Sequence, residues 1–115
     1  MTLLDLRDAL LEVLDDVYHF IAPERKPEHY ILWGETGGAD SVKSDDAPDT
    51  IAIRGRLYYY TSDEYDVIFD DICQSLTDHG IAWKIGNIGY DDTLRQIIYE
   101  VTWEVICGSC SVYKQ

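Results

Sequence analysis

The residues most able to do chemistry are two cysteines near the end of the chain, in the stretch CGSC from Cys107 to Cys110. Two thiols at this spacing are typical of a redox motif, in which the first cysteine sits at a helix N-terminus that lowers its pKa. Only five residues follow Cys110, too few for such a helix. A zinc site would need two more ligands, and Cys73 and the three histidines are isolated in sequence. We therefore expect inert thiols in a short tail, with a small thiol or zinc protein as the alternative.

A second candidate is the aspartate-rich stretch from Thr36 to Asp49. Carboxylates suit a calcium ion, but the ordered ligand pattern of a calcium loop and its closing glutamate are absent. The preceding GETGGAD lacks the lysine and the following helix that a phosphate-binding loop requires. The sequence also holds no nucleophile elbow and no dinucleotide fingerprint. We expect a solvated loop here, and for the whole chain no catalytic residue, no cofactor and no metal site.

Two arginines and several tyrosines form a third candidate, in the stretch RGRLYYY. Alternation from Ile51 to Tyr60 predicts a half-buried strand, with Arg54, Arg56, Tyr58 and Tyr60 on one face. In a later strand, Glu100 and Glu104 also share a face. If the two strands are neighbours, an arginine and a glutamate should lie within ion-pair reach, in one chain or across a subunit contact.

Composition and charge limit the function classes. The hydrophobic fraction of 46% predicts a folded chain. A chain of 115 residues can form one hydrophobic core without stabilising disulfides or metal ions. The net charge of −13 argues against sequence-specific nucleic-acid binding, which needs a basic footprint. The N-terminus does not resemble a signal peptide, and no apolar run approaches the roughly 20 residues of a membrane span. We expect residence in the cytosol and no membrane partner.

Hydrophobic periodicity predicts the elements that position these residues. Helical spacing predicts helices from Thr2 to Tyr18, with Thr2 as N-cap, and after Ser62, with Ser62 as N-cap and Gly80 as the left-handed stop. In the second helix, the predicted apolar stripe comprises Tyr65, Ile68, Phe69, Ile72 and Leu76. The predicted strands are His29 to Glu35, Ile51 to Tyr60, Ile81 to Ile88 and Leu94 to Cys107.

The order α-β-β-α-β-β predicts a single α+β domain over residues 1–106, with residues 107–115 as a short C-terminal tail. Two helices should pack on one face of a mostly antiparallel four-stranded sheet.

These strand ends and turns resemble the tail terminator and tail-to-head joining proteins of siphophages and prophages. The resemblance rests on five segments: Tyr30 to Glu35 (YILWGE), Ala39-Asp40, Leu57 to Thr61 (LYYYT), Asp63 to Gly80, and Tyr90 to Thr93 (YDDT). It covers about four fifths of the chain and contains no catalytic signature. The triple tyrosine and the tail after Ile106 lie outside the pattern.

The resemblance implies a structural tail-completion protein of the virion. Such proteins form a ring of about six subunits that caps the tail tube protein and presents a surface to a head-completion protein. Arg54, Arg56, Tyr58, Tyr60, Glu100 and Glu104 then become candidate subunit contacts. The candidate lumen or partner loop comprises Asp40, Lys43, Asp45, Asp46 and Asp49. Alternatives are a head-closure or minor capsid protein and, from another class, an acidic inhibitor that masks a basic partner.

Overall fold

The computed structural model describes residues 1–38, 51–107 and 112–113. In chain order, the elements are α1 (Leu3–Leu11), β1 (Val17–His19), β2 (His29–Gly38), β3 (Ile51–Thr61), α2 (Val67–Asp78), β4 (Ala82–Asp91) and β5 (Gln96–Cys107). The strands form one sheet in the order β1-β2-β3-β5-β4, in which β1 is parallel to β2 and the other pairs are antiparallel. The predicted α+β class and the mostly antiparallel sheet are confirmed, but the sheet has five strands and not four.

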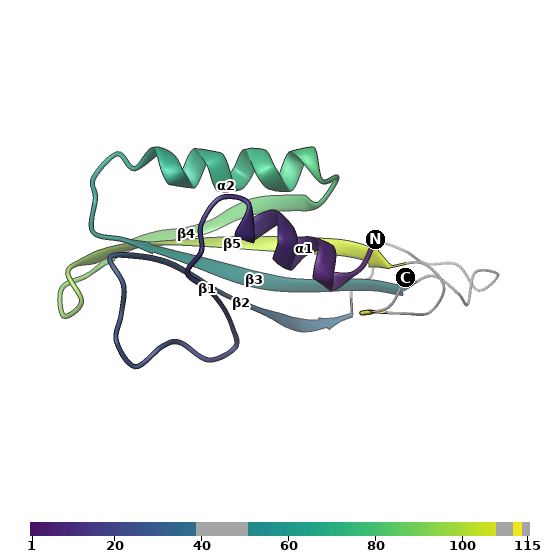
Figure 1. The fold of residues 1–115 in the computed structure, drawn as a ribbon, viewed down its shortest axis with the longest axis horizontal. Coiled ribbons are helices and arrows are strands. Elements are labelled where there is room, and N and C mark those ends of the chain that lie inside the picture. The colour runs from purple at the N-terminus through teal and green to yellow at the C-terminus, as the bar shows by residue number, and fades with distance from the viewer. Residues whose placement is uncertain (39–50, 108–111, 114–115) are drawn as a thin grey trace.

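Both helices cover the same face of the sheet (Figure 1). Alternation along the strands sends apolar side chains to that face, where they meet the helices in one core. From the strands this core contains Trp33, Leu57, Tyr59, Val101, Trp103 and Val105, and from the helices Leu3, Leu6, Leu10, Phe69, Ile72 and Leu76. The Ser75 hydroxyl ties the helices together, because it donates to the carbonyl oxygen of Ala9 at 2.7 Å. The opposite face, covered by neither helix, is called the open face below.

The first helix is shorter than predicted. Thr2 is its N-cap, as expected, and Asp5 completes a capping box. The helix ends at Leu11, and the predicted helical residues Val17 and Tyr18 belong to β1. Acidic residues crowd the stretch after Leu11, where the negative end of the helix dipole disfavours them. β-Branched Val17 and aromatic Tyr18 suit a strand, and β2 supplies the partner.

The second helix begins later than predicted. Its N-cap is Asp66 and not Ser62, because the Asp66 carboxylate accepts from the amide of Ile68 at 2.8 Å. Tyr65 therefore lies outside the helix and is 88% exposed, so its place in the apolar stripe was wrong. The other four stripe residues, Ile68, Phe69, Ile72 and Leu76, pack on the core. Gly80 has φ +72°, as the predicted left-handed stop requires.

The boundary between the fold and the tail also differs from the prediction. Cys107 is the last residue of β5 and is fully buried in the core. Beyond it, Val112 packs against the core, and its carbonyl oxygen accepts from the amide of Leu3 at 2.9 Å. The domain therefore extends past Ile106. Among the described residues, no helix is long and apolar enough to cross a membrane.

Candidate functional site

The open face brings the predicted arginines and glutamates together. β3 and β5 are neighbours, and their register places Arg54 directly opposite Glu104 and Tyr58 opposite Glu100. None of the ion pairs within the described ranges joins either arginine to either glutamate. The expected arginine–glutamate ion pair is therefore not among the ion pairs of this part of the chain. An arginine–glutamate pair across a subunit contact stays a prediction.

A hollow of about 660 Å³ lies among these residues. Its lining includes three cations, Arg54, Arg56 and Lys84, which come from β3 and β4. The chain has only nine lysines and arginines against 22 acids, so three cations in one hollow form a local positive region. Glu104 also lines the hollow and reduces this charge. The arrangement suits contact with an acidic surface, and aromatic and arginine side chains are favoured at such contacts.

The two open-face tyrosines differ in what they can offer a partner. The rings of Tyr60 and Tyr30 stack at 4.3 Å with an interplanar angle of 5°. Burial raises the pKa of the Tyr60 phenol, with smaller effects of Tyr58 and Asp91. Tyr60 is therefore half-buried within the chain's own packing, and Tyr58 is half-buried beside it. The predicted lumen or partner loop, with Asp40, Lys43, Asp45, Asp46 and Asp49, lies outside the described residues.

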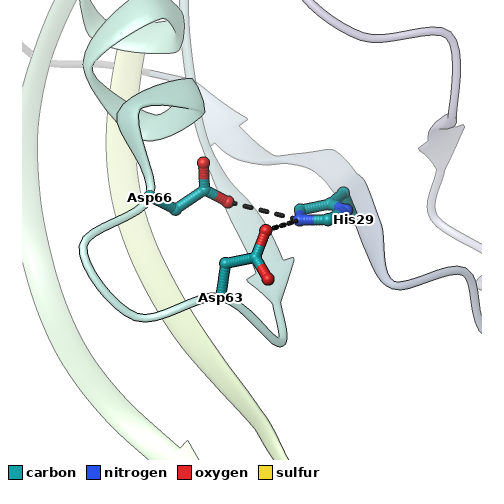
Figure 2. Close-up of side chains that lie close together, drawn as sticks. All are labelled: His29, Asp63 and Asp66. Atoms are coloured by element: carbon teal, nitrogen blue, oxygen red, sulfur yellow. Dashed lines mark hydrogen bonds and ion pairs between the residues drawn. The ribbon is translucent and has the colours of Figure 1, made fainter.

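A cluster of His29, Asp63 and Asp66 lies where β2 begins and α2 starts (Figure 2). The Nε2 atom of His29 lies 2.8 Å from Oδ2 of Asp63 and 3.6 Å from Oδ2 of Asp66. His29 starts β2 and stands opposite Thr61, the last residue of β3. The two aspartates lie in the connection that leads from β3 into α2. The cluster therefore joins a strand start to a helix start, although its members are far apart in sequence.

Asp66 is the anchor of this cluster. The hydroxyls of Tyr59 and Thr61 both donate to its Oδ2 at 2.6 Å, while its Oδ1 caps α2. The side chain is only 5% exposed. Burial alone would raise the pKa of Asp66, but the bonds from Thr61, Tyr59 and the Ile68 amide, with the nearby His29, lower it overall. Burial and the bond to Asp66 raise the pKa of the Tyr59 phenol, so Tyr59 remains protonated and acts as a donor.

The cluster could offer ligands to a metal ion, since one imidazole nitrogen and two carboxylate oxygens lie within 4.8 Å of one another. However, Asp66 already accepts three hydrogen bonds, and His29 already contacts Asp63. These bonds account for the arrangement as a network that fixes the turn between β3 and α2. Sequence reasoning missed the cluster, although an aspartate directly before the apolar stripe of α2 is an N-cap signal.

The cysteines of the described chain are poorly suited to redox chemistry. Burial raises the pKa of the Cys107 thiol, and burial with Asp70 raises that of Cys73 to about 11. Both therefore remain thiols at neutral pH, whereas a reactive cysteine needs a lowered pKa. Cys107 ends a strand and does not begin a helix. Cys110 lies outside the described residues.

No protein-family model matches this chain, and no curated protein matches it either.

Proposed function

We propose that this chain is a structural protein of phage or prophage morphogenesis, namely a tail terminator or tail-to-head joining protein without enzymatic activity. In this proposal the chain assembles in the host cytoplasm into a ring of about six copies. The ring caps the tail tube protein and meets a head-completion protein at the head-proximal end of the virion tail.

The observation that carries the proposal is the position of the residues that resemble the family. The resemblance is a pattern of strand ends and turns, and in this fold Leu57 to Thr61 ends β3 and Tyr90 to Thr93 connects β4 to β5. In the second segment the Asp91 carboxylate accepts from the amides of Thr93 and Leu94 at 2.9 and 3.0 Å. This is a local role for aspartate in a tight turn. The shared residues thus have structural roles in the connections of one α+β layer.

The open face supports the same proposal. A monomer leaves Arg54 and Arg56 exposed beside half-buried tyrosines on a face that neither helix covers. Such a face suits a protein–protein contact more than a catalytic site, because the described residues around it include no nucleophile paired with a base. We assign this face to contacts with a neighbouring protein of the tail or head.

The proposal is tested by counting copies in particles. Particles released on induction of the source bacterium are purified, and mass spectrometry quantifies this chain against the tail tube protein. About six copies per particle would support a single ring. Absence from complete, tailed particles would reject the proposal. An acidic inhibitor would then be the next hypothesis, because the net charge of −13 suits a basic partner captured at low salt and released at high salt.

A further inference from the structure

β4 is the outermost strand on one side of the sheet (Figure 1). Among the described residues, its only strand neighbour is β5, and no backbone hydrogen bond from a loop reaches its outer edge. Almost all of its residues are exposed. A long exposed edge offers unpaired backbone groups to another chain, so proteins usually shorten or cover such edges.

A bulge keeps the large apolar side chains of β4 on one face. Ile85 pairs with Val101 and Ile88 pairs with Tyr99, so two residues of β4, Gly86 and Asn87, stand opposite Glu100 alone. Without the extra residue, simple alternation would place Ile88 on the opposite face from Ile85. Bulges and charged side chains both protect sheet edges in other proteins. In β4 the bulge instead places the apolar side chains on one face.

α2 covers only the start of this apolar row. At its start, the indole N–H of Trp83 donates to the Thr77 hydroxyl of α2 at 3.0 Å. Further along, Ile85, Ile88 and Tyr90 are 46%, 57% and 61% exposed. These three residues are called the β4 edge. A row of large apolar side chains along a free sheet edge is typical of an interaction surface.

The opposite edge of the sheet is also apolar. β1 has only three residues, and Phe20 and Ile21, which directly follow it, are 59% and 79% exposed. Phe20 has φ +66°, a conformation that is rare for a bulky residue and is often found at functional positions. Its ring stacks on His19, which in turn stacks on Trp33, so its position is fixed by packing. Phe20 and Ile21 are called the β1 edge.

Charge favours contact between two copies at these edges. Two chains of net charge −13 repel each other over most of their surface. Neither edge carries a carboxylate of its own, because residues 17–23 and residues 79–90 contain no aspartate or glutamate, although acidic residues flank both segments. The β4 segment also carries one cation, Lys84. The two edges are therefore places where copies of an acidic chain can meet with little repulsion.

We propose that the β4 edge of one copy binds the β1 edge of a second copy, head to tail. Two unlike surfaces on opposite sides of one subunit make a heterologous contact, and repetition of such a contact builds a ring when the rotation closes. The inference rests on the ring-forming function proposed above and names its subunit contact.

The test is a complementation between two variants, Ile88→Lys on the β4 edge and Ile21→Lys on the β1 edge. Both place a charge on an already exposed side chain, so both should fold. Leu11→Lys is the matched control, because Leu11 is 42% exposed on α1 and belongs to neither edge. Size-exclusion chromatography with light scattering follows each protein up to about 1 mM, where even a weak contact is seen.

We expect the wild type and Leu11→Lys to form larger species as concentration rises, and each edge variant alone to stay monomeric. An equimolar mixture of the two edge variants should form dimers, because Ile21→Lys keeps its β4 edge and Ile88→Lys keeps its β1 edge. These dimers should not grow, since the remaining edges are both blocked.

Three results would overturn the inference. These are a wild type that stays monomeric throughout, an Ile21→Lys variant that assembles like the wild type, and a mixture in which no dimer forms. The proposed function is judged separately by the copy number in particles. If the protein is monomeric in solution but present in virions, the proposed function stands and the edge-to-edge contact is rejected. If it forms a ring in solution but is absent from virions, the contact stands and the proposed function is rejected.

Discussion

β3 and β4 are strands of similar length with opposite environments. β3 has 11 residues and β4 has 10, and both contain large apolar side chains, glycine and polar residues. β3 lies between β2 and β5, and five of its 11 residues are buried, whereas β4 has one neighbour among the described strands and no fully buried residue. The difference shows that neighbours on both sides and cover by a helix decide burial. The composition of the strand alone does not.

The largest expected effect is at the end of β3, where Tyr59 and Thr61 bond to Asp66. Asp66→Ala removes the N-cap of α2 and leaves two hydroxyls without their acceptor. We expect a loss of about 3 kcal/mol in the free energy of unfolding, measured by urea denaturation. Asp63→Ala is the control, because Asp63 is exposed and its carboxylate contacts only His29 among the side-chain bonds described. Equal losses in the two variants would show that Asp66 is not the anchor.

A second prediction compares a glycine in each strand. A Cβ at Gly55 of β3 would overlap the carbonyl oxygen of Gly34 and the ring of Trp103, whereas a Cβ at Gly89 of β4 would meet nothing within 4 Å. Gly55→Ala should therefore cost roughly 2 kcal/mol of stability by overpacking, and Gly89→Ala should stay within about 0.5 kcal/mol of the wild type. Thermal unfolding of both variants measures the difference. If Gly55→Ala is as stable as Gly89→Ala, β3 is less tightly packed than described.

Most of the fold could be predicted from the sequence, because it depends on local signals. Alternation predicted β3 and β5, aromatic and β-branched composition predicted β2, Thr2 marked the first helix start, and Gly80 marked the second helix end. β1 was missed because a strand of three residues exists only through its pairing with β2. The start of α2 was misplaced because Ser62 and Asp66 are both good N-caps, and only the contacts with Tyr59 and Thr61 select Asp66.

The candidate sites also combine features that local sequence patterns predict and features that depend on the whole fold. Alternation correctly placed the two arginines on one face of β3 and the two glutamates on one face of β5, and the register sets Arg54 opposite Glu104. Alternation could not predict the side-chain geometry. Neither arginine takes part in the ion pairs of the described residues. The His29 cluster joins residues separated by 34 positions, and the exposure of β4 depends on its place at the end of the sheet. Neither the His29 cluster nor the exposure of β4 can be predicted from a local sequence pattern.

The smallest expected effect is a pH dependence at the end of β3. The pKa of Asp66 is lowered in the folded state below its ordinary value of 3.8, mainly because the bonds from Thr61 and Tyr59 outweigh burial. A carboxyl with a lowered folded pKa contributes stability that is present above the unfolded pKa and is lost as pH falls through the folded pKa. Asp66→Asn removes this contribution at every pH. The difference in unfolding free energy between wild type and Asp66→Asn should therefore be constant near neutrality and should shrink below pH 3.8.

Urea unfolding of the two proteins from neutral pH down to acid measures that difference directly. Subtracting one curve from the other removes the effects of the remaining acids, which both proteins share. A difference that grows on acidification would mean that the folded state favours the protonated carboxyl, against the sum of its hydrogen bonds. A shrinking difference would place the pH-sensitive stability of this region in the bonds between β3 and α2, to which the exposed β4 makes no contribution.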